Sequence, residues 1–228
     1  MQTTIQHFSF DAWNTLMSAN KSFARQRSIA IATAFNYGDY GSAADKYSTV
    51  KKILDSLAEL EGFGAPVLTA WTLLRKIFRD APQDQETLDV VMSEAFELFA
   101  ENPPHVPQEV VVQLHRLKDA GKTVSILSNT NFIPGTVLME SVFDKQFGKD
   151  FFDFALFSDA HGLSKPNPLF FHLADEHIKE IYGCADHDKI MHVGDNEICD
   201  VRGARGHGWR ALHVMSPTDA AFQLMEIK

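Results

Sequence analysis

The sequence predicts an α/β protein in which a doubly wound parallel sheet is interrupted after its first strand by an all-helical insertion. Three observations predict this fold. Short apolar runs alternate with helical patterns over the second half of the chain, four helical patterns follow one another in the first half, and polar residues stand where the apolar runs end. Strands separated by helices favour right-handed crossovers, which place helices on both faces of a Rossmann-like core.

Length and charge restrict the class of protein. The chain has 228 residues, of which 45% are apolar and 22% charged, which suits one large domain with an insertion. Its formal net charge of -9 repels phosphate backbones and anionic lipids, so we expect neither a nucleic acid nor a membrane as partner. A small anionic substrate remains compatible, because a cation held in a cleft reverses the local field.

The cysteines and the N-terminal segment indicate a soluble, cytoplasmic protein. Cys184 and Cys199 are too few for a disulfide framework and lack metal-site spacing. Residues 1–10 lack the charged and apolar regions of a secretory signal. No apolar run approaches the ~18 residues that span a bilayer.

The first half of the chain predicts one strand followed by helices. Residues 5–10 alternate apolar and polar side chains and form a short predicted strand that ends at Asp11. Apolar residues spaced at three and four then predict helices over 21–35, 43–60, 67–78 and 85–99. The consecutive prolines of Asn102-Pro103-Pro104 stop the last helix. We therefore expect a core of residues 1–16 and 105–228 and a helical cap of residues 17–104.

The second half of the chain predicts the rest of the sheet. Strands are expected over 123–127, 154–157, 190–193 and 211–214. Helices are expected over 107–120, 137–147, 168–182, 201–206 and 218–225. Ligands of open parallel sheets bind at the carboxyl ends of the strands, so the polar residues just after each strand are the candidate site.

Those strand ends carry acidic, basic and hydroxyl side chains. They are Asp11 and the following Trp13-Asn14-Thr15, Ser128-Asn129, Lys165 in a later loop, and Asp195 with Asp200 about one helical turn further on. Converging carboxylates repel one another, and a divalent cation and a lysine relieve that cost. Mg²⁺ prefers such hard oxygen ligands. A carboxylate can then act as a nucleophile, with Lys165 and Ser128 binding the transferred group.

The order of these residues resembles the haloacid dehalogenase superfamily. Its first motif, a strand-end Asp usually followed by a variable residue and Gly-Thr, is similar to Asp11 with Asn14-Thr15. Its second motif is similar to Ser128, which ends an apolar strand, and its third to Lys165 before Pro166. Its fourth, Gly-Asp with a later Asp, is similar to residues 194–200. The resemblance spans the chain and includes a helical cap between the first two motifs.

The resemblance implies roles for these residues. Asp11 would be the nucleophile that becomes transiently esterified, with Ser128, Asn129 and Lys165 as its catalytic partners. Asp11, Asp195 and the backbone carbonyl of Trp13 would bind Mg²⁺, and Asp200 would support the metal or Lys165. Substrate would contact Trp13, Asn14, Thr15, Ser128, Asn129 and Lys165. The implied reaction is Mg²⁺-dependent hydrolysis of a small phosphoester through an aspartyl intermediate.

The first motif departs from the phosphatase pattern at Trp13. Phosphatases of this family place an Asp there as general acid and base, a contribution typically worth about 10²–10⁴-fold in rate. An aromatic residue there is closer to the dehalogenases of the family, which need no Mg²⁺ and usually carry a hydroxyl residue where this chain has Asp195. Carbon–halogen hydrolysis through Asp11 and a non-catalytic binding protein that keeps the fold therefore remain alternatives. The ten histidines show no ligand spacing, so most are expected at the surface or in local hydrogen bonds.

Overall fold

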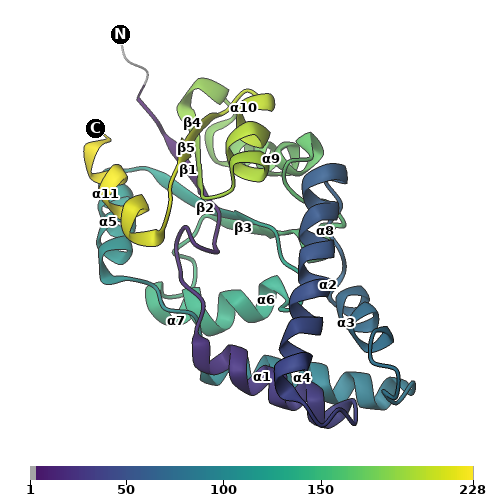
Figure 1. Cartoon of the computed structure of the whole chain (residues 1–228). Helices are drawn as coiled ribbons and strands as arrows, with labels where there is room; N and C mark the ends of the chain where they lie inside the picture. The colour runs from purple at the N-terminus through teal and green to yellow at the C-terminus, as the bar shows by residue number, and fades with distance from the viewer. Residues whose placement is uncertain (1–3, 228) are drawn as a thin grey trace.

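The protein is an α/β protein with a five-stranded parallel sheet, as predicted (Figure 1). The computed structural model describes residues 4–227. The strands are β1 (His7–Phe10), β2 (Thr123–Ser128), β3 (Phe154–Phe157), β4 (Ile190–Gly194) and β5 (Arg210–His213). They lie in the order β3-β2-β1-β4-β5, so the strand that ends at Asp11 occupies the centre of the sheet.

The polar residues of β1 are buried, although their alternation with apolar residues resembles a half-exposed strand. Thr123 Oγ1 and Ser125 Oγ lie 2.7 and 2.8 Å from the two ring nitrogens of His7. Ser9 Oγ lies 2.9 Å from Nδ1 of His192 on β4. These contacts satisfy polar groups that would otherwise be costly to bury, and they fix the register of the central strands.

Helices cover both faces of the sheet. On one face, α5 (Gln108–Asp119) packs with α11 (Pro217–Glu226), and their apolar residues share a core with Phe8 and Phe10 of β1. On the other face, α9 (Pro168–Tyr182) and α10 (Gly203–Gly206) bury Phe170 and Phe171 against β2 and β4. The sheet is therefore doubly wound, and its two separate cores hold the strand ends in place.

Four helices between β1 and α5 form a group that we call the helical insert. They are α1 (Lys21–Ala34), α2 (Tyr40–Glu61), α3 (Val67–Lys76) and α4 (Gln85–Glu101). Trp71, Phe35 and Leu88 belong to a further apolar core, which Phe132 from the loop after β2 joins. Asparagine or aspartate side chains cap α1, α2 and α4. Helix α2 extends from the layer of α1 and α4 toward α8 (Ser158–His161) at the edge of the sheet (Figure 1).

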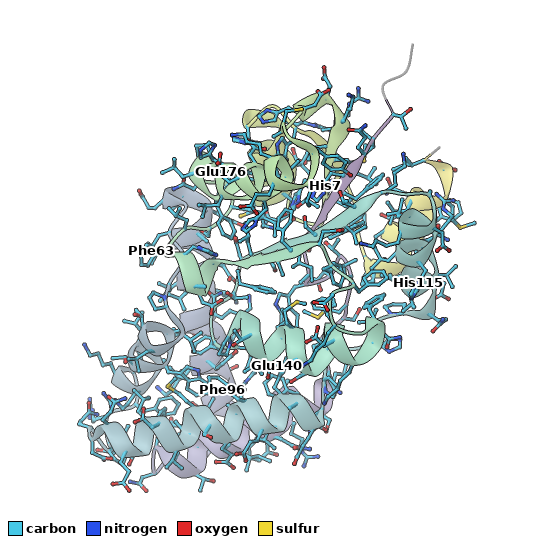
Figure 2. The ribbon with its side chains drawn as sticks, turned by 180° about the vertical axis from the view of Figure 1, so that it is seen from behind. His7, Phe63, Phe96, His115, Glu140 and Glu176 are labelled. Carbon is cyan, nitrogen blue, oxygen red and sulfur yellow. The ribbon has the colours of Figure 1, made fainter. Side chains whose placement is uncertain are left out.

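Two helices differ in detail from their predicted form. The predicted helix 137–147 is α6 (Gly135–Leu138), a π-helical turn (Met139–Phe143) and α7 (Asp144–Phe147) in succession. Figure 2 shows this segment, labelled at Glu140, between the sheet and the helix that carries Phe96. The predicted helix 201–206 begins earlier, with a π-helical segment (Glu197–Arg202), because the side chain of Asn196 caps the backbone N–H groups of Ile198 and Cys199.

Two short helices lie outside the predicted elements. Helix α8 and a 3₁₀ turn (His187–Lys189) were not predicted, and such short helices carry little periodic signal in a sequence. Cys184 is exposed and Cys199 buried, and both are free, as expected. Over residues 4–227, no helix has the length and apolar character needed to cross a membrane.

Candidate active site

Asp11 lies at the carboxyl end of the central strand and is almost fully buried. Its backbone N–H donates to Val193 O of β4, which holds the residue at the sheet edge. Ser128 Oγ donates to Asp11 Oδ1 over 3.1 Å, and Lys165 Nζ donates to the same oxygen over 2.8 Å. No hydrogen bond from residues 4–227 reaches Oδ2. One carboxylate oxygen is thus anchored and the other is left without a donor.

Lys165 is enclosed between two carboxylates. Its side chain is 1% exposed, and Nζ lies 2.8 Å from Asp11 Oδ1 and 2.7 Å from Asp200 Oδ1. Asn129 clamps the backbone of Lys165, because its Oδ1 accepts from Lys165 N and its Nδ2 donates to Lys165 O, each over 2.9 Å. Asn129, which the resemblance implies as a catalytic and substrate-contacting residue, thus positions the lysine in the structure.

Asp200 has both carboxylate oxygens in use. Oδ1 contacts Lys165 and lies 3.2 Å from Nε2 of His192, while Oδ2 accepts from Asn196 N over 2.9 Å. A Cβ on Gly194 would lie 2.2 Å from Asp200 Oδ2, so only glycine allows this approach. The glycine of the fourth motif is required by the packing of Asp200 against the backbone.

The burial of these groups shifts their pKa values in different directions. Burial raises the pKa of Asp11 to about 7, against the opposing effect of the Lys165 ammonium. Burial alone would lower the pKa of Lys165, but the carboxylates of Asp11 and Asp200 outweigh it and raise that pKa. Burial and the nearby Lys165 lower the pKa of His192 to about 4. Near neutral pH the lysine is therefore a cation and His192 a neutral imidazole.

Asp195 completes the acidic group from the end of β4. It is half-buried, and Asn14 Nδ2 donates to its Oδ2 over 3.2 Å. Asn14 has a φ of 55°, in the left-handed region that asparagine adopts more readily than most side chains. This conformation explains how asparagine stands where the first motif usually has glycine.

The donor set fits a divalent cation. Carboxylate oxygens of Asp11, Asp195 and Asp200 all lie within 4.8 Å of one another. Lys165 is the one cation among these four groups, so the carboxylates outnumber the positive charge available to them. Hard oxygen ligands with excess negative charge bind divalent cations, which lower the repulsion among the carboxylates.

A cavity of about 590 Å³ opens above these residues. Asp11, Trp13, Asn14, Asn129, Lys165 and Asp195 line it from the core, and residues of α1 and α2 line it from the helical insert. Trp13 also packs edge-on against Phe99 of α4, with ring centroids 6.3 Å apart. It is therefore both a wall of the cavity and a packing residue between the core and the insert.

Two of the expected substrate contacts do not line the cavity. Thr15 is fully buried, and its Oγ1 has no hydrogen-bond partner among the described residues. Ser128 is also fully buried and reaches the site through Asp11. The tight turn after β1 directs the Thr15 side chain into the interior, an orientation that sequence spacing does not reveal.

Two polar residues of the site were not predicted. His192 joins Ser9, Lys165 and Asp200, and Asn196 links Asp200 to Glu59 of α2 by donating to Glu59 Oε1 over 2.9 Å. A histidine inside an otherwise apolar strand was the available signal for His192, because a buried imidazole needs partners. The partner of Asn196 lies far away in the sequence and gave no signal.

Comparison with known families decides the relationship. A family model described as haloacid dehalogenase-like hydrolase matches residues 5–208. The chain belongs to this family. The matched range contains every residue of the site described above, and the resemblance read from the four motifs is confirmed. A search of curated proteins finds no match.

Solved structures of the family share the fold. The chain is similar to 2-haloacid dehalogenase from Pseudomonas syringae pv. Tomato DC3000, with 21% identity, a TM-score of 0.62, and coverage of 92% of this chain and 86% of that chain. It is also similar to the magnesium-bound HAD-hydrolase YfnB from Bacillus subtilis, with 16% identity, a TM-score of 0.68, and coverage of 93% of this chain and 89% of that chain. A third similar structure is the HAD phosphatase from Thermococcus onnurineus, with 19% identity, a TM-score of 0.63, and coverage of 92% of this chain and 86% of that chain. Both dehalogenases and phosphatases are therefore among the family's similar structures.

Proposed function

We propose that the protein hydrolyses a small phosphoester in a Mg²⁺-dependent reaction through a covalent intermediate on Asp11. The observation that carries this proposal is the arrangement of Asp11. One of its oxygens is held by Ser128 and Lys165, and the carboxylate borders a cavity beside Asp195. A carboxylate positioned in this way can attack an electrophile whose charge is neutralised by its surroundings.

The reaction requires two displacements at phosphorus. Asp11 attacks the phosphorus, the bond to the leaving oxygen breaks, and an aspartyl phosphate forms. Water then attacks the same phosphorus, which releases inorganic phosphate and regenerates the carboxylate. The Lys165 ammonium offsets the negative charge of the phosphoryl oxygens throughout. Trp13 has no acidic proton to give to the leaving oxygen, so substrates whose leaving group is already a weak base should react fastest.

Asp11 and Asp195 would hold the metal ion, with the backbone carbonyl of Trp13 as a further ligand. When bound, Mg²⁺ supplies positive charge that offsets the carboxylates and the phosphoryl oxygens. We assign Asp200 to the positioning of Lys165, because both of its oxygens are already engaged. This assignment narrows the sequence-based expectation that Asp200 supports either the metal or the lysine.

The helical insert would act as a cap that selects a small anionic substrate. The guanidinium of Arg27 in α1 lies 3.5 Å from the ring centroid of Tyr47 and lines the cavity. Its Nε is buried without a hydrogen-bond partner among the described residues. An unpaired guanidinium nitrogen at a cavity wall suits a second anionic group on the substrate.

An assay with an activated aryl phosphate tests the proposal. Phosphate release is expected with Mg²⁺, loss of turnover after chelation of the metal, and recovery when Mg²⁺ is restored. Asp11→Asn should reduce turnover to the background rate, because an amide cannot serve as the nucleophile. Turnover that survives either treatment would contradict the proposal.

Dehalogenation is the second candidate because it explains Trp13. When Asp11 attacks a carbon that carries a halogen, the halide leaves without a proton, so no general acid is needed at position 13. Halide release from a 2-haloacid without Mg²⁺, together with no phosphatase activity, would favour this reaction. If neither activity is found while Mg²⁺ still raises the melting temperature, the protein is a binding protein that keeps the fold.

A further inference from the structure

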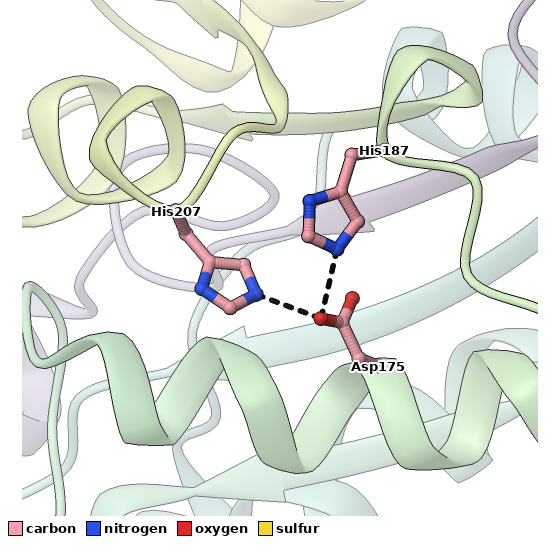
Figure 3. A group of neighbouring side chains, drawn as sticks. All are labelled: Asp175, His187 and His207. Atoms are coloured by element: carbon pink, nitrogen blue, oxygen red, sulfur yellow. Dashed lines mark hydrogen bonds and ion pairs between the residues drawn. The ribbon is translucent and has the colours of Figure 1, made fainter.

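Three side chains that have no part in the proposed reaction converge beside α9. Asp175 comes from α9, His187 from the turn before β4, and His207 from the end of α10 (Figure 3). Nε2 of His187 lies 2.9 Å from Asp175 Oδ2, and Nε2 of His207 lies 2.8 Å from the same oxygen. Three separate elements thus present two imidazoles and one carboxylate to a common point.

The carboxylate is buried and oriented. Asp175 is 3% exposed, and its second oxygen, Oδ1, accepts from Trp209 Nε1 over 3.0 Å. The tryptophan therefore fixes the carboxylate so that Oδ2 faces both histidines. Metal-binding carboxylates and imidazoles are commonly held in this way by an outer hydrogen bond.

The space around His187 is restricted by a glycine. Gly208 has a φ of +96°, and a Cβ at that position would lie 3.0 Å from Nδ1 of His187. The turn that follows His207 therefore needs glycine both for its backbone conformation and for the close approach of His187. Helix α9 and the two turns bring the three groups together.

The ligand set and spacing suit a transition-metal cation. Ligand atoms of Asp175, His187 and His207 lie within 4.8 Å of one another. Two ligands of a tetrahedral Zn²⁺, each bound at about 2.1 Å, lie about 3.4 Å apart, so the two contacts to Oδ2 need to open by about half an ångström. The side chain of His187 is 36% exposed, which allows this rotation and gives water access to the fourth position.

We propose that Asp175, His187 and His207 form a second metal site, which we call the histidine site, and that it binds Zn²⁺ or a similar transition-metal ion. Two imidazole nitrogens distinguish it from the all-carboxylate group of Asp11, Asp195 and Asp200, because nitrogen ligands favour Zn²⁺ over Mg²⁺. Its role is structural. The ion joins α9 to the turns that precede β4 and β5, and it stabilises the folded chain by binding only when these segments are assembled.

The site lies close to the reacting group without belonging to it. The ring of His207 stacks on Phe171 with centroids 5.7 Å apart, and Phe171 contacts His192 edge-on at 5.8 Å. One phenyl ring thus separates the histidine site from the residue that contacts Lys165 and Asp200. Occupancy of the site should stiffen this side of the core.

Zinc titration of the full-length protein tests the proposal. The titration uses metal-free protein carrying Cys184→Ser and Asp195→Asn, which remove the exposed thiol and impair the carboxylate group. Calorimetry should show one equivalent of Zn²⁺ bound per chain and an increase in melting temperature. Co²⁺ should quench part of the tryptophan fluorescence, because Trp209 donates to a ligand carboxylate.

Matched variants locate the bound ion. His187→Gln and His207→Gln keep a side chain that can hydrogen-bond to Asp175 but remove the imidazole, so both should fold and lose the binding. Trp209→Phe should weaken it by about 10-fold, within the usual effect of an outer hydrogen bond. His172→Ala, which changes an exposed histidine of the same helix, should leave it unchanged.

Either of two results would overturn the proposal. The first is no stoichiometric Zn²⁺ binding in the starting protein, which would leave the three residues as a hydrogen-bonded group only. The second is Zn²⁺ binding of unchanged affinity in both glutamine variants, which would place the ion elsewhere. Neither result depends on catalytic turnover, so the inference can fail while the proposed function stands.

Discussion

Trp13 determines which chemistry the first motif can support. Its ring contacts Phe99 of the helical insert and borders the cavity, at the position where the resemblance implies an acidic side chain in phosphatases. The neighbouring Lys165 cannot replace that acid, because it is held between Asp11 and Asp200, which raise its pKa. In the proposed phosphoester hydrolysis, the leaving oxygen therefore has no proton donor among these residues.

Replacing Trp13 with Asp should increase the hydrolysis of phosphoesters with poor leaving groups. General acid catalysis supplies about 10²–10⁴-fold, so we expect at least a tenfold increase in kcat for an alkyl phosphate and little change for an activated aryl phosphate. Trp13→Asn is the matched control, because it removes the same ring without adding an acid. Equal effects of the two substitutions on both substrates would contradict this expectation.

Replacing Lys165 with Met should destabilise the protein as well as abolish turnover. The substitution leaves the buried carboxylates of Asp11 and Asp200 without their cation, a change that typically costs about 3–5 kcal/mol. Urea unfolding at pH 7 measures the loss. Saturating Mg²⁺ should recover part of the lost stability, because the cation offsets the same charges. A variant as stable as the wild type would show that Lys165 does not compensate the charges of the two carboxylates.

Among the secondary-structure elements, the central strands depend on buried neutral histidines. Burial lowers the pKa of His7 to about 3 and that of His192 to about 4. Both values lie below the ordinary histidine pKa of about 6.5. Their contribution to stability is therefore complete above pH 6.5 and is lost as the pH falls through the folded-state values.

Acid should therefore destabilise the protein with a slope to which both buried histidines add and which the raised pKa of Asp11 opposes. Below pH 6.5 each buried histidine adds up to about 1.4 kcal/mol per pH unit to the loss of stability. His7→Asn should reduce the slope of the unfolding free energy against pH by up to about 1.4 kcal/mol per pH unit, the effect of one proton. Urea unfolding between pH 7 and pH 5 measures this slope. His172→Ala, an exposed histidine, should not change the slope; an unchanged slope in His7→Asn would show that His7 is not the group that titrates.

Across the molecule, α2 connects the helical insert to the loops of the active site. Asn131 Nδ2 donates to Asp55 Oδ1 over 2.8 Å, and Asn196 Nδ2 donates to Glu59 Oε1. Both acceptors stand on α2 and border the cavity. The position of the helical insert over the reacting group is thus tied to side chains of two core loops.

Asn131→Ala should weaken substrate binding more than it slows the reaction. A hydrogen bond of this kind contributes about 0.5–1.5 kcal/mol, so we expect KM to increase by about 2- to 10-fold with kcat nearly unchanged. Gln85→Ala, which removes a side-chain hydrogen bond to Asp89 within α4, is the control and should alter neither constant. A decrease in kcat alone would indicate that Asn131 acts on the chemical step.

Sequence patterns predicted most of the fold because periodicity records burial. The parallel sheet, the helices on both of its faces and the helical segment after β1 were all predicted from apolar spacing. The earlier start of the helix at Glu197 was missed, because the cap formed by Asn196 precedes the apolar pattern. The burial of His7 and Ser9 was not anticipated either, because their partners lie more than a hundred residues away.

The sequence by itself predicted the family, which the family model confirms, and the sheet edge at which the acidic and basic residues of the candidate site meet. Each of these follows from local pattern and from the order of strand ends. Only the tertiary structure decided that Thr15 is buried away from the cavity. It also decided that both carboxylate oxygens of Asp200 contact Lys165, His192 or Asn196. The meeting of Asp175 with His187 and His207 is likewise a result of the tertiary structure. These contacts depend on the direction of side chains and on the packing of distant segments, which the spacing of residues along a chain does not contain.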